Sequence, residues 1–207
     1  MTKVLVVLLG FNIGLASAQT RVRANDPLPT SGIVSIDLDF ATVPTTVEQL
    51  IKQSNLIVDG RVISVLPPIR VNPRDPASIR TDSLVAVTRV LSGTMPTGAG
   101  TIAVSQFGGK IGDLEAVFPK DQMMIAGERY VFFLHPDKGP SPNAMGYLRY
   151  YVAGGWVGKA KVVDGSISFP AKAHGEGLII YNRSDFASFI SAVEQKILVS
   201  SDQKRTP

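Results

Sequence analysis

The chain has 207 residues, a formal net charge of +4 and no cysteine. Without cysteine the protein has no disulfide, no thiolate nucleophile and no cysteine-bound zinc. The mild charge balance is not that of a nucleic-acid binder, whose basic residues cluster on one face. Stability must therefore come from a hydrophobic core, which a chain of this length is able to bury.

The first eighteen residues have the pattern of a secretory signal peptide. Lys3 supplies the positive start, residues 4–15 are mostly apolar, and Ala16, Ser17 and Ala18 form a small-residue cleavage site. The apolar run is too short and too interrupted for a membrane-spanning helix, which needs about 20 apolar residues. We expect cleavage between Ala18 and Gln19, a secreted or periplasmic location, and no membrane span in the mature chain.

The rest of the chain is expected to form one domain between two less regular ends. Residues 19–43 are rich in turn residues and are predicted to be an irregular extension. Within it, residues 33–40 alternate in polarity and are able to add an edge strand. Residues 44–199 are predicted to be the folded domain, and residues 200–207 a disordered tail.

Two helices are expected, one at each end of this domain. Thr45 and Glu48 have the spacing of a capping box, and the helix that follows ends near Ser54. Ser184 is the predicted N-cap of the second helix. Apolar residues then recur along one helical face. They are Phe186, Phe189, Ile190, Val193 and Ile197.

Strand patterns fill the region between the helices. The expected strands are residues 56–66, 84–91, 101–107, 129–134 and 147–153, with a polar loop over 67–82 and a long connection over 108–128. Residues 129–134 are almost entirely apolar, which predicts a central strand buried on both faces. Gly60 interrupts the apolar face of the first strand, as expected at a bulge or a barrel bend.

The clearest local signal is Asp164-Gly165, a two-residue hairpin turn between alternating segments. The register that this turn imposes pairs Val162 with Ile167 and Lys161 with Ser168. Together the elements predict a mainly β fold. Its core is a five-stranded, OB-like, partly open barrel with an added C-terminal hairpin, a short helix before the first strand and a C-terminal amphipathic helix.

The order of these elements resembles the netrin-like module, which is shared with tissue inhibitors of metalloproteinases. The matching segments are residues 56–62, 87–93, 108–109 and 127–134, within residues 46–163. The resemblance implies a five-stranded OB-type barrel with flanking helices, and exported bacterial proteins of unassigned function look similar. It does not imply protease inhibition. The inhibitors chelate the protease zinc through an N-terminal cysteine, and the predicted mature chain begins at Gln19.

Aromatic residues and arginines form the candidate binding surface. A barrel of this type binds ligands on a strand face and the adjoining loops. Aromatic rings beside arginines suit an oligosaccharide or a single strand of nucleic acid. The alternative is that the rings pack across strands and the arginines lie in a solvated loop. The candidate residues are Arg70, Arg74, Arg80, Tyr147, Tyr150, Tyr151 and Trp156.

The two histidines give a second candidate site. His135 ends the apolar strand and His174 lies in a loop. With Asp137 and Glu176 they are able to form a four-ligand metal site or an acid–base pair. The alternative is two separate, exposed loop histidines. The chain has no Gly-x-Ser-x-Gly nucleophile motif, and residues 154–160 lack the spacing of a phosphate loop.

These observations favour an exported, non-enzymatic module that binds a protein or an envelope polymer without a cofactor. Two alternatives stay open. One is a metal-dependent or hydrolytic enzyme that uses His135 and His174. The other is an oligosaccharide or oligonucleotide binder. An enzyme needs its polar groups to converge in one pocket, whereas a binding module needs only an exposed face.

Overall fold

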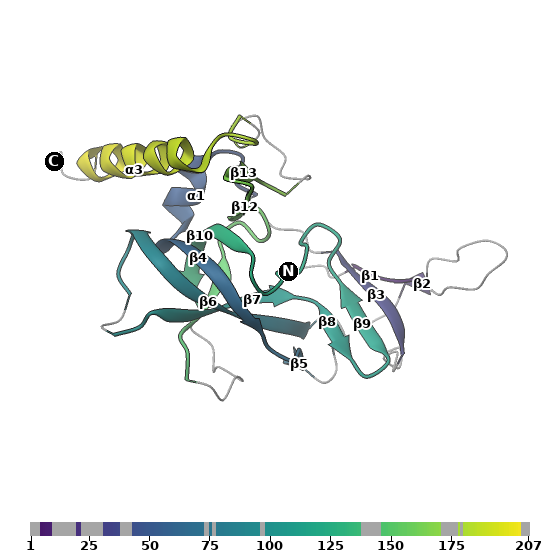
Figure 1. Ribbon diagram of the computed structural model, residues 1–207. Helices are drawn as coiled ribbons and strands as arrows, with labels where there is room; N and C mark the ends of the chain where they lie inside the picture. Colours follow the sequence, from purple (N-terminus) through teal and green to yellow (C-terminus); the bar gives the residue numbers. More distant parts are fainter. Residues whose placement is uncertain are drawn as a thin grey trace.

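The computed structural model describes residues 5–9, 20–21, 31–37, 43–72, 75, 78–95, 98–137, 146–170, 178 and 180–203. Five strands pair edge to edge into a closed ring (Figure 1). In ring order they are β4 (Leu56–Val65), β6 (Ile79–Ser92), β7 (Thr101–Phe107), β11 (Arg149–Val152) and β10 (Arg129–Pro136). All neighbours are antiparallel except β7 and β11, which run parallel. The predicted mainly β fold with a five-stranded barrel is confirmed.

Strand β10 is buried on both faces, as predicted. Phe132 and Leu134 belong to a core cluster that receives side chains from all five ring strands and fills the barrel. Val131 and Phe133 belong to a second cluster outside the ring, which is covered by the helices and the C-terminal hairpin. A continuous apolar run is needed here because successive strand residues point to opposite faces, and both faces meet a core.

Gly60 lies at an irregularity of β4, as predicted. The pairing register between β4 and β6 shifts between Asp59 and Gly60. A Cβ atom at Gly60 would lie 2.6 Å from Cγ1 of Val85. The strands therefore approach too closely at this bend for any larger residue.

The two predicted helices are present, and Figure 1 shows α3 (Phe186–Gln203) across the top of the molecule above α1 (Val47–Gln53). Phe189, Ile190 and Val193 are buried in the outer core, in agreement with the predicted apolar face of the second helix. Because α3 continues to Gln203, residues 200–203 of the predicted tail are helical.

Both predicted helix caps are wrong by one residue. The first N-cap is Thr46, whose hydroxyl accepts a hydrogen bond from the backbone N–H of Gln49 at 3.2 Å. Thr45 and Glu48 have the same spacing, but Glu48 instead forms an ion pair with Lys196 of α3. Tertiary pairing therefore selects between two capping boxes that the sequence offers side by side.

The second cap is Asp185, which accepts a hydrogen bond from the Ser188 backbone N–H at 2.9 Å. The predicted cap, Ser184, donates its hydroxyl to the Tyr181 carbonyl oxygen at 2.6 Å instead. The carboxylate of Asp185 also suits the positive end of the helix.

The C-terminal hairpin forms in the predicted register. Strand β12 (Lys159–Val163) pairs with β13 (Ser166–Ser168), with Val162 opposite Ile167 and Lys161 opposite Ser168. Asp164 and Gly165 have φ values of 49° and 75°, as the mirror-image turn of a two-residue hairpin requires. Strand β12 also pairs with β10, so the hairpin extends the sheet beyond the ring.

Two predicted connections contain strands. Strand β6 begins at Ile79, so Arg80 and Asp82 lie in a strand rather than in the predicted loop, and β5 (Ile69–Arg70) pairs with it. The predicted connection over 108–128 contains β8 (Gly109–Ile111) and β9 (Leu114–Val117). The loop prediction was wrong at Asp82, because this residue is buried near Arg149. A hydropathy pattern assigns a charged residue to the surface even where a buried partner allows it to lie inside.

A second sheet joins β8 and β9 to the N-terminal segment. Its order is β2 (Thr20–Arg21), β1 (Leu5–Leu9), β3 (Gly32–Asp37), β9 and β8. Strand β3 therefore has a neighbour on each side, which corrects its prediction as an edge strand. Strand β1 belongs to the predicted signal peptide, so cleavage after Ala18 would return β3 to an edge.

Neither helix in the described part of the chain has the length and apolar character needed to cross a membrane.

Candidate binding pocket

A cavity of about 410 Å³ lies against four strands of the ring. Strand β6 contributes Arg80, β7 contributes residues 105–107, β10 contributes His135, and β11 contributes residues 151–152. The remaining wall comes from Gln53 at the end of α1, from Phe118 and Asp121 after β9, and from Gly154 and Gly155 after β11. The wall therefore combines aromatic rings with polar side chains from distant parts of the chain.

Strand pairing assembles the polar part of this wall. Tyr151 lies opposite Ser105 of β7 on one side and opposite His135 of β10 on the other. On the next strand, Asp82 of β6 lies opposite Ser105. Residues that lie opposite each other share a face of the sheet. The ring therefore aligns these four side chains in one row on its outer face.

Arg80 packs against two aromatic rings at the pocket. Its Cζ atom lies 4.4 Å from the ring centroid of Phe107 and 4.8 Å from that of Tyr151. Such stacking stabilises a guanidinium group and fixes its plane. Within the described part of the chain the guanidinium has no hydrogen bond or ion pair, and its Nε is buried. The fold therefore orients this charge without neutralising it.

Ser105 is the second polar group in the wall that the fold leaves without a partner. The residue is 3 % exposed, and its Oγ has no hydrogen-bond partner among the described residues. Buried polar groups in proteins are almost always hydrogen-bonded, so each exception requires an explanation. A ligand atom in the adjoining cavity is one such explanation.

His135 is half-buried, and its ring centroid lies 5.9 Å from that of Tyr151. Burial lowers the pKa of His135, and the nearby Asp137 carboxylate offsets part of this effect. A lowered pKa makes the neutral imidazole the main form near pH 7. Asp137 accepts hydrogen bonds from Arg149 Nε at 2.6 Å and from the Tyr151 hydroxyl at 3.1 Å. These bonds hold the Asp137 carboxylate beside Arg149 and Tyr151.

The candidate metal site is described only in part. His135 lies in the pocket wall and Asp137 at its side, whereas His174 and Glu176 lie outside the described residues. Over residues that are described, no three His, Asp or Glu side chains form a group able to hold a metal ion. The metal-dependent alternative therefore stays a hypothesis.

Two of the seven candidate binding residues, Arg80 and Tyr151, meet in the pocket. Arg70 lies on β5 and does not line this cavity. Arg74 lies outside the described residues. The expected combination of an aromatic ring with an arginine is therefore present at one point, where β6 and β11 contribute to the same wall.

The other aromatic candidates do not line the pocket. Tyr150 is buried in the barrel core, and Tyr147 is half-buried outside the pocket wall. Trp156 is buried in the outer core, where its ring lies edge-on to Phe118 with centroids 5.6 Å apart. Phe118 lines the pocket, so Trp156 lies directly behind its wall. For Tyr150 and Trp156, core packing is the role that the structure gives.

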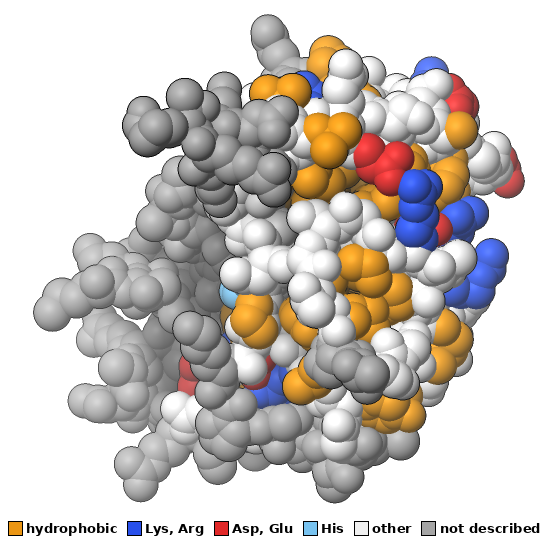
Figure 2. All heavy atoms as spheres, turned by 90° about the vertical axis from the view of Figure 1, so that its left-hand side faces the viewer, with side chains coloured by type: hydrophobic (Ala, Val, Ile, Leu, Met, Phe, Trp, Pro, Cys, Tyr) orange, Lys and Arg blue, Asp and Glu red, His pale blue; other side chains and the backbone are white. Residues whose placement is uncertain are grey.

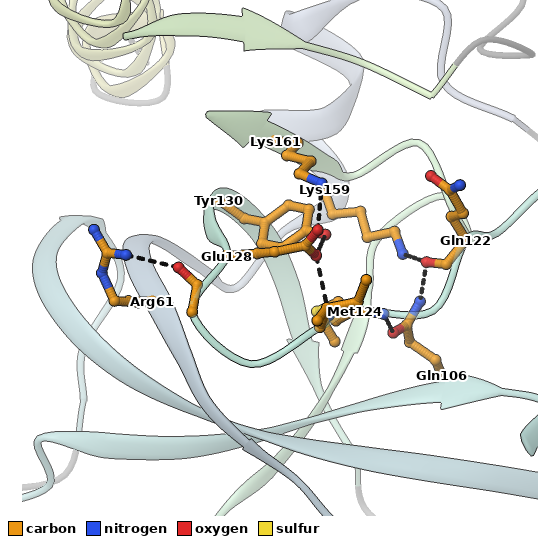
Figure 3. A network of polar contacts seen from close by, with 10 residues as sticks. Arg61, Gln106, Gln122, Met124, Glu128, Tyr130, Lys159 and Lys161 are labelled. Carbon is orange, nitrogen blue, oxygen red and sulfur yellow. Dashed lines mark hydrogen bonds and ion pairs between the residues drawn. The ribbon is translucent and has the colours of Figure 1, made fainter. Parts of the chain in front are cut away.

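A polar network includes two residues of the pocket wall, Gln106 and Asp121. Gln106 donates a hydrogen bond to Asp121 at 3.0 Å. It also donates to the Gln122 carbonyl oxygen at 3.1 Å and accepts a hydrogen bond from the Met124 backbone N–H at 3.0 Å (Figure 3). Lys159 forms an ion pair with Asp121 at 2.5 Å and also donates to the Gln122 carbonyl oxygen. Burial lowers the pKa of Lys159, and Asp121 offsets part of that shift. Nothing in the sequence distinguished these residues as a group.

A second cavity of about 420 Å³ also borders this network. Lys159, Lys161 and Tyr130 line it. Lys161 forms an ion pair with Glu128, and the Tyr130 hydroxyl donates to the same carboxylate (Figure 3). Burial acts to raise the pKa of Glu128, but the hydrogen bonds from Lys161 and Tyr130 outweigh it and lower that pKa. This cavity therefore has a wall whose charges are already paired.

Charged side chains of both signs are mixed on one face of the molecule. Figure 2 views the molecule from the left-hand side of Figure 1 and shows Lys and Arg side chains beside Asp and Glu on that face. Such mixing differs from the basic stripe of a typical nucleic-acid interface. At the surface, ion pairs join Arg89 to Glu194 and Lys196 to Glu48. A third pair joins the partly exposed Arg129 to the buried Asp59.

No protein-family model matches this chain, and no curated protein is significantly similar to it.

Proposed function

We propose that this chain is an exported, non-enzymatic binding module that holds part of a protein or an envelope polymer in the pocket beside Arg80. The observation that carries the proposal is the stacked guanidinium of Arg80, which faces a cavity without a partner from the described chain. A stacked, oriented arginine in an aromatic-walled cavity is typical of ligand recognition.

The topology of the ring supports an OB-type barrel within this proposal. The ring is five-stranded, and its second and third strands in chain order, β6 and β7, carry Arg80, Ser105 and Phe107. OB-type barrels bind oligosaccharides and oligonucleotides on this part of the ring. The resemblance to the netrin-like module spans the same strands and is part of the proposal, whereas protease inhibition is not.

The polar geometry favours binding over catalysis. A serine nucleophile needs a base within hydrogen-bond reach. The buried Ser105 hydroxyl has no hydrogen-bond partner among the described residues, so it does not bond to His135. The carboxylate best placed to orient His135 is that of Asp137, which bonds to Arg149 and Tyr151 instead. An oligosaccharide ligand fits the same pocket as a second candidate, because aromatic side chains and arginines are present together.

Export is the second part of the proposal, and residues 1–18 carry it. The protein recovered from the cell envelope or the medium is expected to begin at Gln19, because the small residues Ala16 and Ala18 suit signal peptidase. Intact-mass spectrometry measures this directly. A stable exported species that keeps Lys3 would contradict it.

Binding in the pocket is expected to change the fluorescence of Trp156, the only tryptophan in the chain. Its ring packs against Phe118 behind the pocket wall. The purified protein is titrated with short peptides, neutral and acidic oligosaccharides, and short oligonucleotides. We expect a saturable response to a peptide or an oligosaccharide, and a loss of that response in Tyr151→Ala.

Tyr147→Ala is the matched control, because Tyr147 is a half-buried tyrosine that does not line the pocket. This variant is expected to keep the wild-type response. Equal responses in Tyr151→Ala and Tyr147→Ala, or no saturable response to any probe, would argue against the pocket as the binding site. A response to oligonucleotides alone would favour the nucleic-acid alternative.

A further inference from the structure

We propose that the pocket recognises a carboxylate on a ligand with an apolar body, that the guanidinium of Arg80 binds both carboxylate oxygens, and that Ser105 donates a further hydrogen bond to one of them. This inference rests on the proposed binding function and adds the chemical class of the ligand. Two buried side-chain atoms of the pocket wall lack a hydrogen-bond partner in the described part of the chain: Nε of Arg80 and Oγ of Ser105. Both are able to donate a hydrogen bond.

The shape of the Arg80 guanidinium decides the direction in which it binds. The group packs against the rings of Phe107 and Tyr151. Because it is planar, its N–H groups point outward within its own plane. A planar fork of this kind matches a carboxylate, which accepts two parallel hydrogen bonds. Lysine has the same charge but no such fork.

The charge balance of the wall favours an anion. The carboxylate of Asp121 forms an ion pair with Lys159, and that of Asp137 is bound by Arg149. The third carboxylate nearby, that of Asp82, lies 3.9 Å from Nη1 of Arg149. Among the described residues, therefore, no carboxylate forms an ion pair with Arg80. A carboxylate brings one negative charge to this one cation, whereas a phosphate ester brings more charge and favours several cationic partners. The balance therefore favours the carboxylate.

Ser105 and His135 complete the donor set. Ser105 lies opposite Tyr151 in the strand pairing, and Tyr151 contacts Arg80, so the serine hydroxyl and the guanidinium belong to the same part of the wall. His135 lies opposite Tyr151 on the other strand. Burial lowers its pKa, and a neutral imidazole still has one N–H to donate.

The rest of the wall suits an apolar body. Phe107, Phe118 and Val152 line the cavity, and its volume of about 410 Å³ accommodates a small group rather than a folded segment. Two sources of a carboxylate on such a body fit an exported binding module. One is the C-terminal carboxylate of a peptide with an apolar last residue, and the other is the carboxylate of an acidic sugar.

Matched probes separate the two sources. The purified protein is titrated by calorimetry and by Trp156 fluorescence with a short peptide ending in leucine and with the same peptide carrying a C-terminal amide. A trimer of galacturonic acid and a trimer of galactose form the second pair. We expect at least one carboxylate probe to bind. Its uncharged counterpart should bind with an affinity lower by about tenfold or more, because it lacks the charge-assisted hydrogen bond.

Substitutions test the assigned partners. Arg80→Met is expected to abolish carboxylate binding, and Arg80→Lys to weaken it about tenfold because the bidentate geometry is lost. Ser105→Ala is expected to weaken it several-fold. Arg70→Met is the control, since Arg70 lies on neighbouring β5 but does not line the pocket, and it should bind as the wild type does. Thermal unfolding of each variant shows whether the fold is retained, and Arg80→Lys keeps the test available if Arg80→Met unfolds.

Each outcome bears on the proposal. Equal affinity for the charged and uncharged members of both pairs, with loss of both in Tyr151→Ala, would overturn the carboxylate assignment and leave the binding pocket in place. Unchanged carboxylate affinity in Arg80→Lys and Arg80→Met would also overturn it. Failure of every probe to bind the wild type would count against both the pocket and its ligand class.

Discussion

Replacing Phe132 by alanine is expected to lower the free energy of unfolding by about 3–5 kcal/mol. Phe132 is fully buried inside the barrel, and its ring lies 5.2 Å from that of Tyr130. Removing it leaves a cavity that the closed ring of strands is poorly able to fill, because each ring strand is bonded to neighbours on both sides. Phe133→Ala is expected to cost a similar amount by emptying the outer core instead.

Urea unfolding measures both losses as shifts of the midpoint at a constant slope. Ile125→Ala is the control, because Ile125 is 63 % exposed, and its change should stay within about 0.5 kcal/mol. Phe132→Leu retains part of the volume and gives a smaller loss if the alanine variant does not fold. Midpoints that match the wild type for both Phe132→Ala and Phe133→Ala would refute the two-core assignment.

The sequence predicts best those elements in which the apolar positions of the sequence coincide with the buried positions of the fold. The apolar run of β10 reflects a strand with a core on each face, and the stripe on α3 reflects one buried helical face. In the C-terminal hairpin, the turn residues Asp164 and Gly165 alone determine which residues pair. In each case the local pattern and the tertiary environment impose the same requirement.

Buried charges explain why the strand predicted over residues 84–91 begins earlier in the structure, at Ile79 of β6. Arg149 is buried between Asp137 and Asp82, with 3.9 Å between its Nη1 and the Asp82 carboxylate. A hydropathy pattern treats Asp82 as exposed because its partner on β11 is far along the chain. Burial of such a residue depends on the pairing, and the pairing is a property of the fold.

The candidate site was predictable only in part for a related reason. Tyr150 and Tyr151 are neighbours on β11, and neighbours on a strand point to opposite faces. Tyr150 and Tyr151 therefore cannot line the same wall, and their adjacent positions in the sequence already indicate this. Ser105 carries no such signal. Its importance comes from a hydroxyl that is buried beside a cavity, which only the assembled barrel reveals.

Replacing Asp121 by asparagine is expected to destabilise the protein by about 3–5 kcal/mol, because it leaves the charge of Lys159 buried without its partner. Lys159 is 3 % exposed, and its ammonium lies 2.5 Å from the Asp121 carboxylate. Asparagine keeps an oxygen able to accept the hydrogen bond that Gln106 donates to Asp121. The loss therefore reports mainly on the ion pair rather than on the network around it.

The double variant Asp121→Asn, Lys159→Met separates the charge from the packing. Replacing a buried ion pair by neutral groups of similar volume is often neutral or even stabilising. The double variant is therefore expected to be more stable than Asp121→Asn alone. If it is instead less stable than that single variant, the buried charge is not the source of the loss.

The pH dependence of stability gives an independent check on the same pair. Burial lowers the pKa of Lys159, and Asp121 raises it, so Asp121→Asn should lower that pKa further. An unfolded lysine has a pKa of about 10.4. Between the folded and the unfolded pKa the unfolded state binds more protons, so stability increases with pH in that window. Asp121→Asn should therefore regain stability as the pH rises from 7 toward 10, relative to the double variant, which lacks Lys159. Urea unfolding of both variants across this range measures the difference. Parallel pH profiles would show that Lys159 keeps its proton in the folded Asp121→Asn protein, and would contradict the lowered pKa.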